Sequence, residues 1–409
     1  VMGWVINAMA SVVSVMLNMD KWQAVWICVI IALVYAILSG FWGVVVTDLV
    51  QFCIAMFGSI SLAIIALNYV GGMETLLQKL SYLSGTGAVD DSTLKFIPPI
   101  PPDSINSTSF WESPFSKFLI FTTIMWWSHH GTDGGGYIIQ RMSSAKNERH
   151  ALLATLWYNL AHYALRVWPW IIVAVVSIVM FPQIPEAYSE LGVKAGYPLV
   201  MNTLLGPGLK GILIVSFLAA FMSTIDTHLN WGASYLINDI YKRFYKPNET
   251  ERHYVVVGKI ITVLLMLLAA FTALKMQSIS KAWEFIFSMG AGIGLVLILR
   301  WFWWRVNAWS EITALATSII ITISLEFIAF YQTITAGEVY SLFGTEPILF
   351  GISLQVHHKL LIIVPTAVIS WLTVTFLTEP EPIDQLQKFY ARAQPGGWWG
   401  PVTFNFKHT

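Results

Sequence analysis

Charge and cysteine are both scarce in this sequence, and their scarcity excludes several classes of protein. Charged residues make up 11% of its 409 positions, against about 25% in soluble domains. The formal net charge of +0 argues against nucleic acid as a partner, because nucleic-acid binding requires a basic face. Cys28 and Cys53 lie inside apolar runs, where they offer neither a disulfide framework nor metal-ligand spacing.

The sequence is instead rich in long apolar runs. Hydrophobic residues fill 56% of it, and a membrane-spanning helix needs roughly 20 of them in succession. Gly40 and Gly43 divide one long run into two helices, and Val1–Leu17 is interpreted as the end of a further span. We therefore predict an all-α, multi-pass protein of the cell membrane, embedded in the lipid bilayer, with about ten transmembrane helices. The uncharged runs are Trp22–Thr47, Leu49–Met73, Val167–Pro185, Ile260–Leu274, Phe285–Leu299 and Leu360–Thr378.

Basic residues in the short connections predict the orientation. Lysine and arginine concentrate in cytoplasmic loops, and three basic clusters here alternate with connections that have few of either. The segment 379–409 is accordingly predicted to be cytoplasmic, and the loop 71–112 to be extracellular. The clusters are Arg141, Lys146 and Arg149; Lys242, Arg243, Lys246 and Arg252; and Arg300 with Arg305.

A glycine-rich stretch from Trp126 to Tyr137 interrupts the fourth span. Gly134, Gly135 and Gly136 disfavour helix at about 1 kcal/mol each relative to alanine. Unwound backbone inside a membrane must line a cavity, so a broken helix near 129–137 is expected to bind solute. The alternative is a surface loop at the end of a span. The candidate solute-binding residues here are Trp126, His129, Asp133 and Tyr137.

The fifth span contains polar residues at helical spacing. Asn159, His162 and Arg166 share one face, and Pro169 is expected to kink the helix after them. Arg166 is too deep to reach the interface easily, so it either faces the solute cavity or pairs with an acid such as Asp133 or Asp226. Asn159, His162 and Arg166 join the candidate solute-binding set, as does Ser288 in a later span.

Two further features suggest a cation. Ala220, Ser223 and Thr224 lie on one helical face and offer hard oxygen ligands without strong charge, although hydroxyls in helices also bond back to their own carbonyls. Asp48 lies between two uncharged runs, and an intramembrane carboxylate is by default a functional hypothesis. The alternative for Asp48 is a helix-terminal charge near the cytoplasmic interface.

At these motifs the chain resembles the sodium:solute symporter family, which includes sodium–glucose and sodium–proline carriers. Ser39–Gln51 is similar to the family's glycine-rich turn and Thr-Asp-x-x-Gln helix. Tyr137–Arg141 is similar to its Tyr-Ile-x-Gln-Arg segment, and Met222–Asn230 followed by Asp239-Ile240-Tyr241 to its sodium-site helix.

The resemblance implies a leucine-transporter-type fold of two inverted five-helix repeats, with sodium as coupling ion and no organic cofactor. It implies that the Ala220 carbonyl, Ser223 and Thr224 form half of the main sodium site, and that Tyr137 covers the solute. Asp48 and Asp226 are assigned to a second cation or to ion release. The predicted segments are 1–70, the remnant of a first repeat lacking its first helices; 71–112, an extracellular loop; 113–305, the second repeat; 306–378, two peripheral spans; and 379–409, a cytoplasmic C-terminal segment.

These observations predict sodium-driven uptake of a small polar organic solute, and no enzymatic activity. Glycines 134–136 stand where sugar carriers of the family have polar side chains, which argues against a sugar. Arg166 can hold a carboxylate with two parallel hydrogen bonds, so we hypothesise a solute that carries a carboxylate. Two alternatives are a membrane-embedded metalloenzyme using His129, His130, Asp133 and His162, and a receptor that keeps the transporter scaffold.

Overall fold

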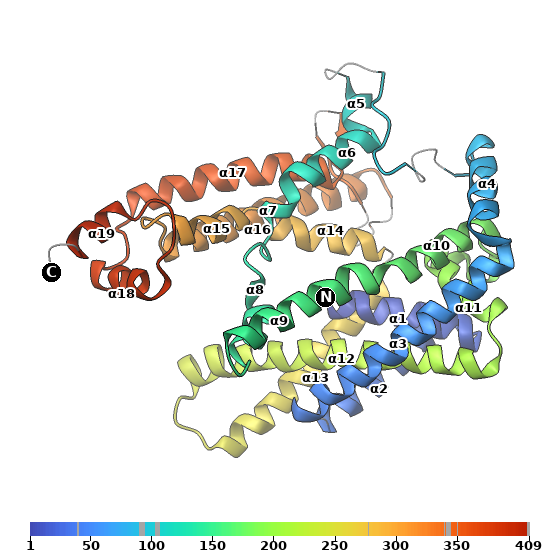
Figure 1. The fold of residues 1–409 in the computed structure, drawn as a ribbon, viewed down its shortest axis with the longest axis horizontal. Coiled ribbons are helices and arrows are strands. Elements are labelled where there is room, and N and C mark those ends of the chain that lie inside the picture. The colour runs from blue at the N-terminus through green and yellow to red at the C-terminus, as the bar shows by residue number, and fades with distance from the viewer. Residues whose placement is uncertain are drawn as a thin grey trace. The chain divides into compact units, whose positions relative to one another are not determined.

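The computed structural model describes residues 1–38, 41–89, 95–102, 107–276, 278–338, 340, 345–349 and 351–406. Within its helices, the side chains of residues 37–38, 41–48, 136–137, 140–141, 190 and 404–406 are left out of the description. The described chain is almost entirely helical (Figure 1), as the sequence predicts. Its short strands β1 (Ile348–Leu349) and β2 (Ile352–Ser353) pair antiparallel as a hairpin.

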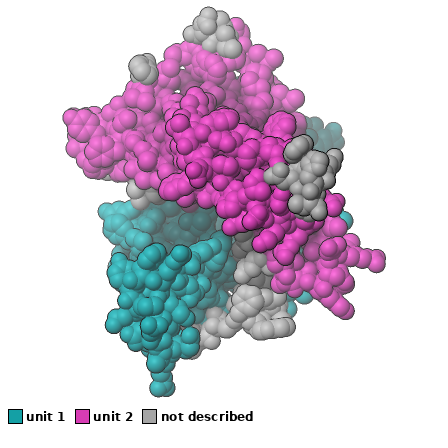
Figure 2. Space-filling view, turned by 90° about the vertical axis from the view of Figure 1, so that its left-hand side faces the viewer, with its two compact units in different colours: residues 1–93, 156–279 teal, residues 94–155, 280–409 magenta. Residues whose placement is uncertain are grey.

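Contacts divide the chain into two compact units (Figure 2). Unit 1 comprises Val1–Thr93 and Leu156–Ile279, and unit 2 comprises Leu94–Thr155 and Ser280–Thr409. Each unit therefore contains segments that are distant in the sequence. The expected inverted repeats are a different division of the chain and stay a prediction.

Unit 1 is built around the long helix α12. Its residues Phe221, Ile225 and Leu229 pack into a core with α1, α2 and α13, while Leu213 packs into a second core with α3, α4, α10 and α11. The helices are α1 (Met2–Leu17), α2 (Lys21–Leu38), α3 (Phe41–Val70), α4 (Gly72–Gly85), the π-helix η3 (Leu160–Leu165), α10 (Val167–Met180), the 3-10 segment η4 (Glu186–Ala195), α11 (Gly196–Leu204), α12 (Pro207–Ser234), the π-helix η5 (Tyr235–Tyr245) and α13 (Glu251–Lys275).

Unit 2 pairs the long helices α16 and α17, which lie side by side in Figure 1. Trp371 of α17 is fully buried. It packs against Ala314 of α16 and against residues at the start of α15 and just after its end. The helices are α5 (Thr108–Glu112), α6 (Pro114–Ile120), the π-helix η2 (Phe121–Met125), α7 (Trp126–Ser128), α8 (Gly135–Ser143), α14 (Ile279–Met289), α15 (Gly294–Phe302), α16 (Ala308–Thr335), α17 (Val356–Leu377), α18 (Ile383–Ala393) and α19 (Gly400–Phe406); α9 (Glu148–Asn159) crosses the boundary between the units.

Seven helical segments of the described chain are long and apolar enough to cross a membrane. The bent pair Met2–Leu17 and Lys21–Ala36, which turns by 115°, would make eight if it were one span. A multi-pass arrangement is therefore supported, and the expected count of ten is not confirmed. The seven are Leu49–Val70, Glu148–Met180, Pro207–Tyr245, Glu251–Lys275, Ile279–Phe302, Ala308–Thr335 and Val356–Leu377.

The C-terminal segment folds back onto the end of α15. Trp399 and Val402 are buried with Leu386 of α18, and Trp304 packs against them. The backbone N–H of Trp398 donates to the carbonyl of Phe302 at 2.6 Å. This approach requires glycine at position 397, where φ is +98° and a Cβ would lie 2.4 Å from that same carbonyl.

Candidate functional site

The fourth predicted span is interrupted, as the glycine-rich sequence indicates. It runs through α6, η2 and α7, stops at Ser128, and resumes at Gly135 as α8. Gly134 and Gly135 adopt φ values of +94° and +65°, which favour glycine over residues with a Cβ. The observed interruption, His129–Gly134, lies within the predicted break near 129–137, and the helix restarts once a glycine has reversed the chain.

Asp133 anchors this break to another helix. Its carboxylate accepts the backbone N–H of Gly135 at 3.1 Å and the Arg300 guanidinium at 2.5 Å. Arg300, at the end of α15, also bonds Glu311 of α16 at 2.9 Å. Arg300 therefore supplies the positive charge beside Asp133, a partner that the sequence analysis did not name and that stands 167 positions away.

A second interrupted helix packs against the first. The span Ile279–Phe302 turns between α14 and α15, and its glycines face the first break. A Cβ at Gly294 would lie 2.2 Å from the carbonyl oxygen of Trp127, and one at Gly290 would lie 2.6 Å from Nδ1 of His130. Glycine here allows close approach of two backbones rather than a positive φ.

The surroundings of the first break are aromatic. The His129 ring lies 5.9 Å from the Phe287 ring, and Phe287 lies 4.1 Å from Trp283. His129 accepts the backbone N–H of Gly131 at 2.9 Å through Nδ1. The Trp126 side chain is exposed in this unit. These residues give the break an apolar, ring-lined border.

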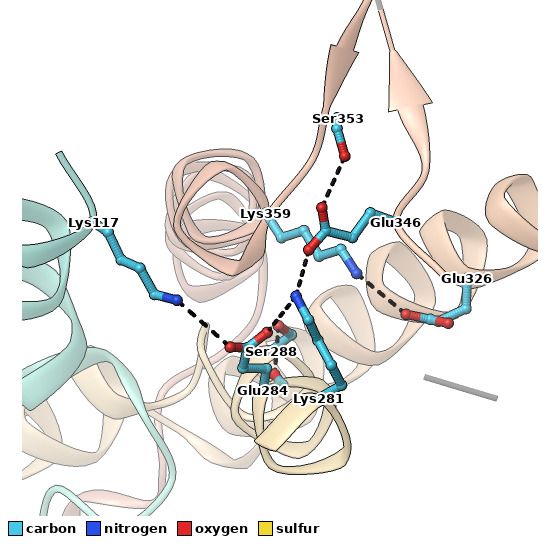
Figure 3. A network of polar contacts seen from close by, with 8 residues as sticks. All are labelled: Lys117, Lys281, Glu284, Ser288, Glu326, Glu346, Ser353 and Lys359. Carbon is cyan, nitrogen blue, oxygen red and sulfur yellow. Dashed lines mark hydrogen bonds and ion pairs between the residues drawn. The ribbon is translucent and has the colours of Figure 1, made fainter. Parts of the chain in front are cut away.

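Ser288 belongs to a different polar network, drawn in Figure 3. Its hydroxyl is buried and donates to the Glu284 carbonyl at 2.9 Å. Around it lies a cavity of about 10 Å³, room for about one water molecule. A solute would not fit there, so Ser288 supports α14 locally in this structure, and its part in solute binding stays a prediction.

Ion pairs hold this network together across four elements. Lys281 of α14 contacts Glu284 at 3.3 Å and also bonds Glu346, which precedes the hairpin. Lys359 of α17 bonds Glu326 of α16 at 3.2 Å. Burial alone would raise the pKa of Glu346, but hydrogen bonds from Lys281 and Ser353 outweigh it and hold that pKa below its usual range.

The polar residues of the fifth span lie in unit 1. His162 Nε2 and Arg166 Nη2 are 3.2 Å apart, and the guanidinium lies over the Trp170 ring at 5.2 Å from its centre. His162 and Arg166 are therefore neighbours, as their helical spacing predicts. Asn159 ends α9, and the π-helix η3 separates it from Arg166. The wide turn lies just before Pro169, which lacks the N–H that a regular helix would donate there.

The hydroxyl-bearing helix α12 shows the local bonding that was weighed as an alternative. Thr224 Oγ1 donates to the Ala220 carbonyl at 2.8 Å, and His228 Nδ1 lies 2.8 Å from the Thr224 carbonyl. Ser223 is half-buried on the same face. Asp226 is buried and accepts from Asn230 at 3.0 Å. It follows Ser223 by three positions, so the two lie on neighbouring sides of the helix.

Two predicted site residues lie outside the described side chains. Asp48 falls in the helical backbone of α3 and Tyr137 in that of α8. Among the residues that the structure describes, no group of three or more His, Cys, Asp and Glu side chains is placed to hold a metal ion. His129 and His130 are ring neighbours in unit 2, and His162 belongs to unit 1.

Similar proteins are transporters. A zebrafish (Danio rerio) sodium/glucose cotransporter 4 is 25% identical over 80% of this chain and 52% of its own length. The sodium/glucose cotransporter of Vibrio parahaemolyticus is 23% identical over 79% of this chain and 60% of its own. The osmoregulated proline transporter of Bacillus subtilis is 24% identical over 70% and 53%. The chain thus spans little more than half the length of these relatives.

A solved structure shares the fold. It is the substrate-bound, outward-open state of a Na⁺-coupled sialic acid symporter, with a TM-score of 0.59 and 17% identity, covering 93% of this chain and 73% of that one. The sequence profile of the sodium:solute symporter family matches residues 4–320. These findings do not favour the metalloenzyme alternative, because both the family and the relatives are transporters. The chain belongs to the sodium:solute symporter family.

Proposed function

We propose that this protein couples the movement of sodium to uptake of a small polar organic solute by alternating access. The observation that carries the proposal is the interruption at His129–Gly134 of a segment that the sequence predicts to be a span, in a chain of this family. Free backbone groups at membrane depth need a cavity or a ligand. Transporters place their solute and ion sites at such breaks.

Sodium is proposed to bind at the Ala220 carbonyl, Ser223 and Thr224. The Thr224 hydroxyl bonds the Ala220 carbonyl at 2.8 Å, so both oxygens already lie within one turn of the same helix face. If the Thr224 hydroxyl rotated, its oxygen and the Ala220 carbonyl oxygen could both coordinate an ion. The proposed role of Asp226, like that of Asp48, is in ion release or a second site.

The solute is proposed to contact Trp126, His129, Asp133 and Tyr137, with Asn159, His162, Arg166 and Ser288 as the further members of the set. Asp133 is neutralised by Arg300, so the break itself offers an apolar and hydrogen-bonding surface rather than a net charge. Arg166 remains the residue proposed to bind a carboxylate. The repeat boundaries, the extracellular loop 71–112 and a cytoplasmic C-terminal segment are proposed on the sequence pattern alone.

Uptake into proteoliposomes of the full-length protein tests the sodium site. Ser223→Ala and Thr224→Ala should each raise the sodium half-saturation more than they lower the maximal rate, because each removes one oxygen from a site with few. Thr366→Ala is the matched control, since Thr366 also bonds its own helix carbonyl, that of Ile362, at 2.7 Å. If Ser223→Ala and Thr224→Ala both keep the parent half-saturation, the site lies elsewhere.

A further inference from the structure

A groove of unit 1 runs between α13 and the continuous helix formed by α12 and η5. Its volume is about 380 Å³, and Ala36 of α2 also lines it. Gly258 lets η5 approach α13 here, because a Cβ at that position would lie 2.9 Å from Cδ1 of Ile237. Side chains on both walls, such as Asn238 and Val255, are exposed. The groove is therefore open along its length and suits a molecule that stays partly outside the protein.

One wall of the groove is polar although it belongs to a candidate membrane span, Pro207–Tyr245. Asn230, Ser234 and Asn238 follow one another there at intervals of four, and all three are exposed. Asn238 Nδ2 donates to Ser234 Oγ at 3.1 Å, which leaves the amide a second N–H and the hydroxyl its own hydrogen as donors. Polar groups at membrane depth need a partner, so this wall favours an occupant with acceptor atoms.

Lys259 gives the opposite wall a positive charge. It is exposed and lies within the candidate span Glu251–Lys275, about 12 Å along the helix from Glu251. Of the described residues that line the groove it is the only charged one, and no hydrogen bond, ion pair or ring contact engages its ammonium within the described chain. A charge inside a membrane span is costly and is normally paired. Charge complementarity therefore selects an anionic occupant.

Beside Lys259, one side of α13 is apolar and faces outward. Val256, Ile260, Leu264 and Leu267 lie there at helical spacing, and their side chains are between 46% and 59% exposed. A hydrocarbon chain can lie along this side while a charged group reaches Lys259. The groove and its border thus match a molecule with an anionic head and an apolar tail.

We propose that this groove binds an anionic phospholipid, with its phosphate between Lys259 and Asn238 and an acyl chain along Val256 and Ile260. Basic pockets between transmembrane helices bind lipid headgroups of this kind. The acyl chain distinguishes this occupant from free phosphate, which would gain nothing from the apolar side of α13. The site shares no residue with the proposed sodium ligands, and it does not depend on the proposed transport function.

Native mass spectrometry of the full-length protein tests this by titration with palmitoyl-oleoyl phosphatidylglycerol and, as its net-neutral match, palmitoyl-oleoyl phosphatidylcholine. The two lipids share their acyl chains and differ only in the headgroup. The first equivalent of phosphatidylglycerol should bind about tenfold more tightly than that of phosphatidylcholine, the gain expected for one charged hydrogen bond. The measurement needs neither sodium nor transport, so failure of the proposed sodium coupling cannot affect the result.

Three variants locate the site. Lys259→Gln should abolish the preference for phosphatidylglycerol, and Lys259→Arg, which keeps the positive charge, should retain it. Lys275→Gln is the matched control and should change nothing, because Lys275 is an exposed lysine at the other end of the same helix and is not among the described residues that line the groove. Gel filtration and thermal unfolding establish that each variant is folded.

Three results would overturn the proposal. One is equal affinity for the two lipids in the parent, which is also the result expected if another part of the protein covers the groove. Another is an unchanged preference in folded Lys259→Gln. The third is displacement of phosphatidylglycerol by inorganic phosphate, because the occupant would then be a soluble anion.

Discussion

Charged residues at the candidate sites have different surroundings in the two units. In unit 2, Asp133 is bound by Arg300, and Glu346 by Lys281. In unit 1, Arg166 lies over the uncharged ring of Trp170, and Asp226 accepts from the amide of Asn230. A charge bonded to its opposite holds elements together, whereas a charge that lies over a neutral ring can still gain an ionic partner. The comparison assigns structural roles to Asp133 and Glu346 of unit 2 and leaves Arg166 of unit 1 suited to a ligand.

The largest expected effect is at Arg300. Arg300→Ala removes the partner of Asp133, whose side chain is 11% exposed, and also that of Glu311. Breaking a buried pair costs about 3–5 kcal/mol; because Arg300 is itself a third exposed, we expect about 2 kcal/mol. Denaturant unfolding in detergent measures the loss. The double variant Arg300→Gln with Asp133→Asn should recover part of it, and a fully additive double variant would deny the pairing a structural role.

Glu346 is expected to have the next largest effect, and one that depends on pH. Its pKa is lower in the folded protein than in the unfolded chain, so its contribution is present above pH about 4.3 and is lost as pH falls through the folded value. Thermal unfolding between pH 6 and pH 3 should show the parent losing its advantage over Glu346→Gln, about 1 kcal/mol. A constant difference across that range would show that the bonds drawn in Figure 3 do not stabilise the charged form.

Arg166 should matter less for folding than Arg300. Arg166→Gln removes the contact with Trp170, and such contacts contribute about 0.5–1 kcal/mol. Measuring the free energies of unfolding of Arg166→Gln and Arg300→Ala under the same conditions tests this difference directly. Arg166→Lys should meanwhile raise the half-saturation for a carboxylate solute at normal protein yield. A loss of stability equal to that of Arg300→Ala would erase the distinction between the units.

The smallest effect is expected at an exposed pair of unit 1. Lys242 and Glu251 are 3.5 Å apart with side chains 42% and 87% exposed. Exposed pairs contribute about 0.2–1 kcal/mol, so Lys242→Gln should change the free energy of unfolding by less than about 0.5 kcal/mol. This variant sets the background against which Arg166→Gln is judged. Lys242 also lies 4.7 Å from the centre of the Tyr254 ring, so a larger change would mean that this second contact adds to the ion pair.

Local chemistry explains what the sequence could predict. The interruption near Gly134 follows from glycines adjacent in the chain, and the hydroxyl stripe of α12 from helical spacing. The second break, at Gly290–Ile293, was missed because those glycines stand in an otherwise apolar run and allow close packing rather than a turn with positive φ. Sequence spacing carries no signal for such a contact.

Contacts between residues that are distant in the sequence could not be predicted either. Arg300 was interpreted as one of the cytoplasmic basic residues, and nothing in its neighbourhood points to Asp133, 167 positions away. Trp398 and Trp399 follow Pro395 and two glycines, which favour an open segment by composition, yet their aromatic bulk docks them onto α15.

The wide turns of η2, η3 and η5 have a consequence for how this protein tolerates changes in length. A π-turn carries an additional residue within an otherwise regular helix. Deleting one codon within Leu160–Leu165 can therefore remove that additional residue and let the turn close as an ordinary α-helix, while the helical segments on either side keep their relative rotation. The backbone bonds would survive, and Arg166 would keep its direction relative to Asn159. Insertions and deletions, normally confined to loops, can here be accommodated within a membrane helix.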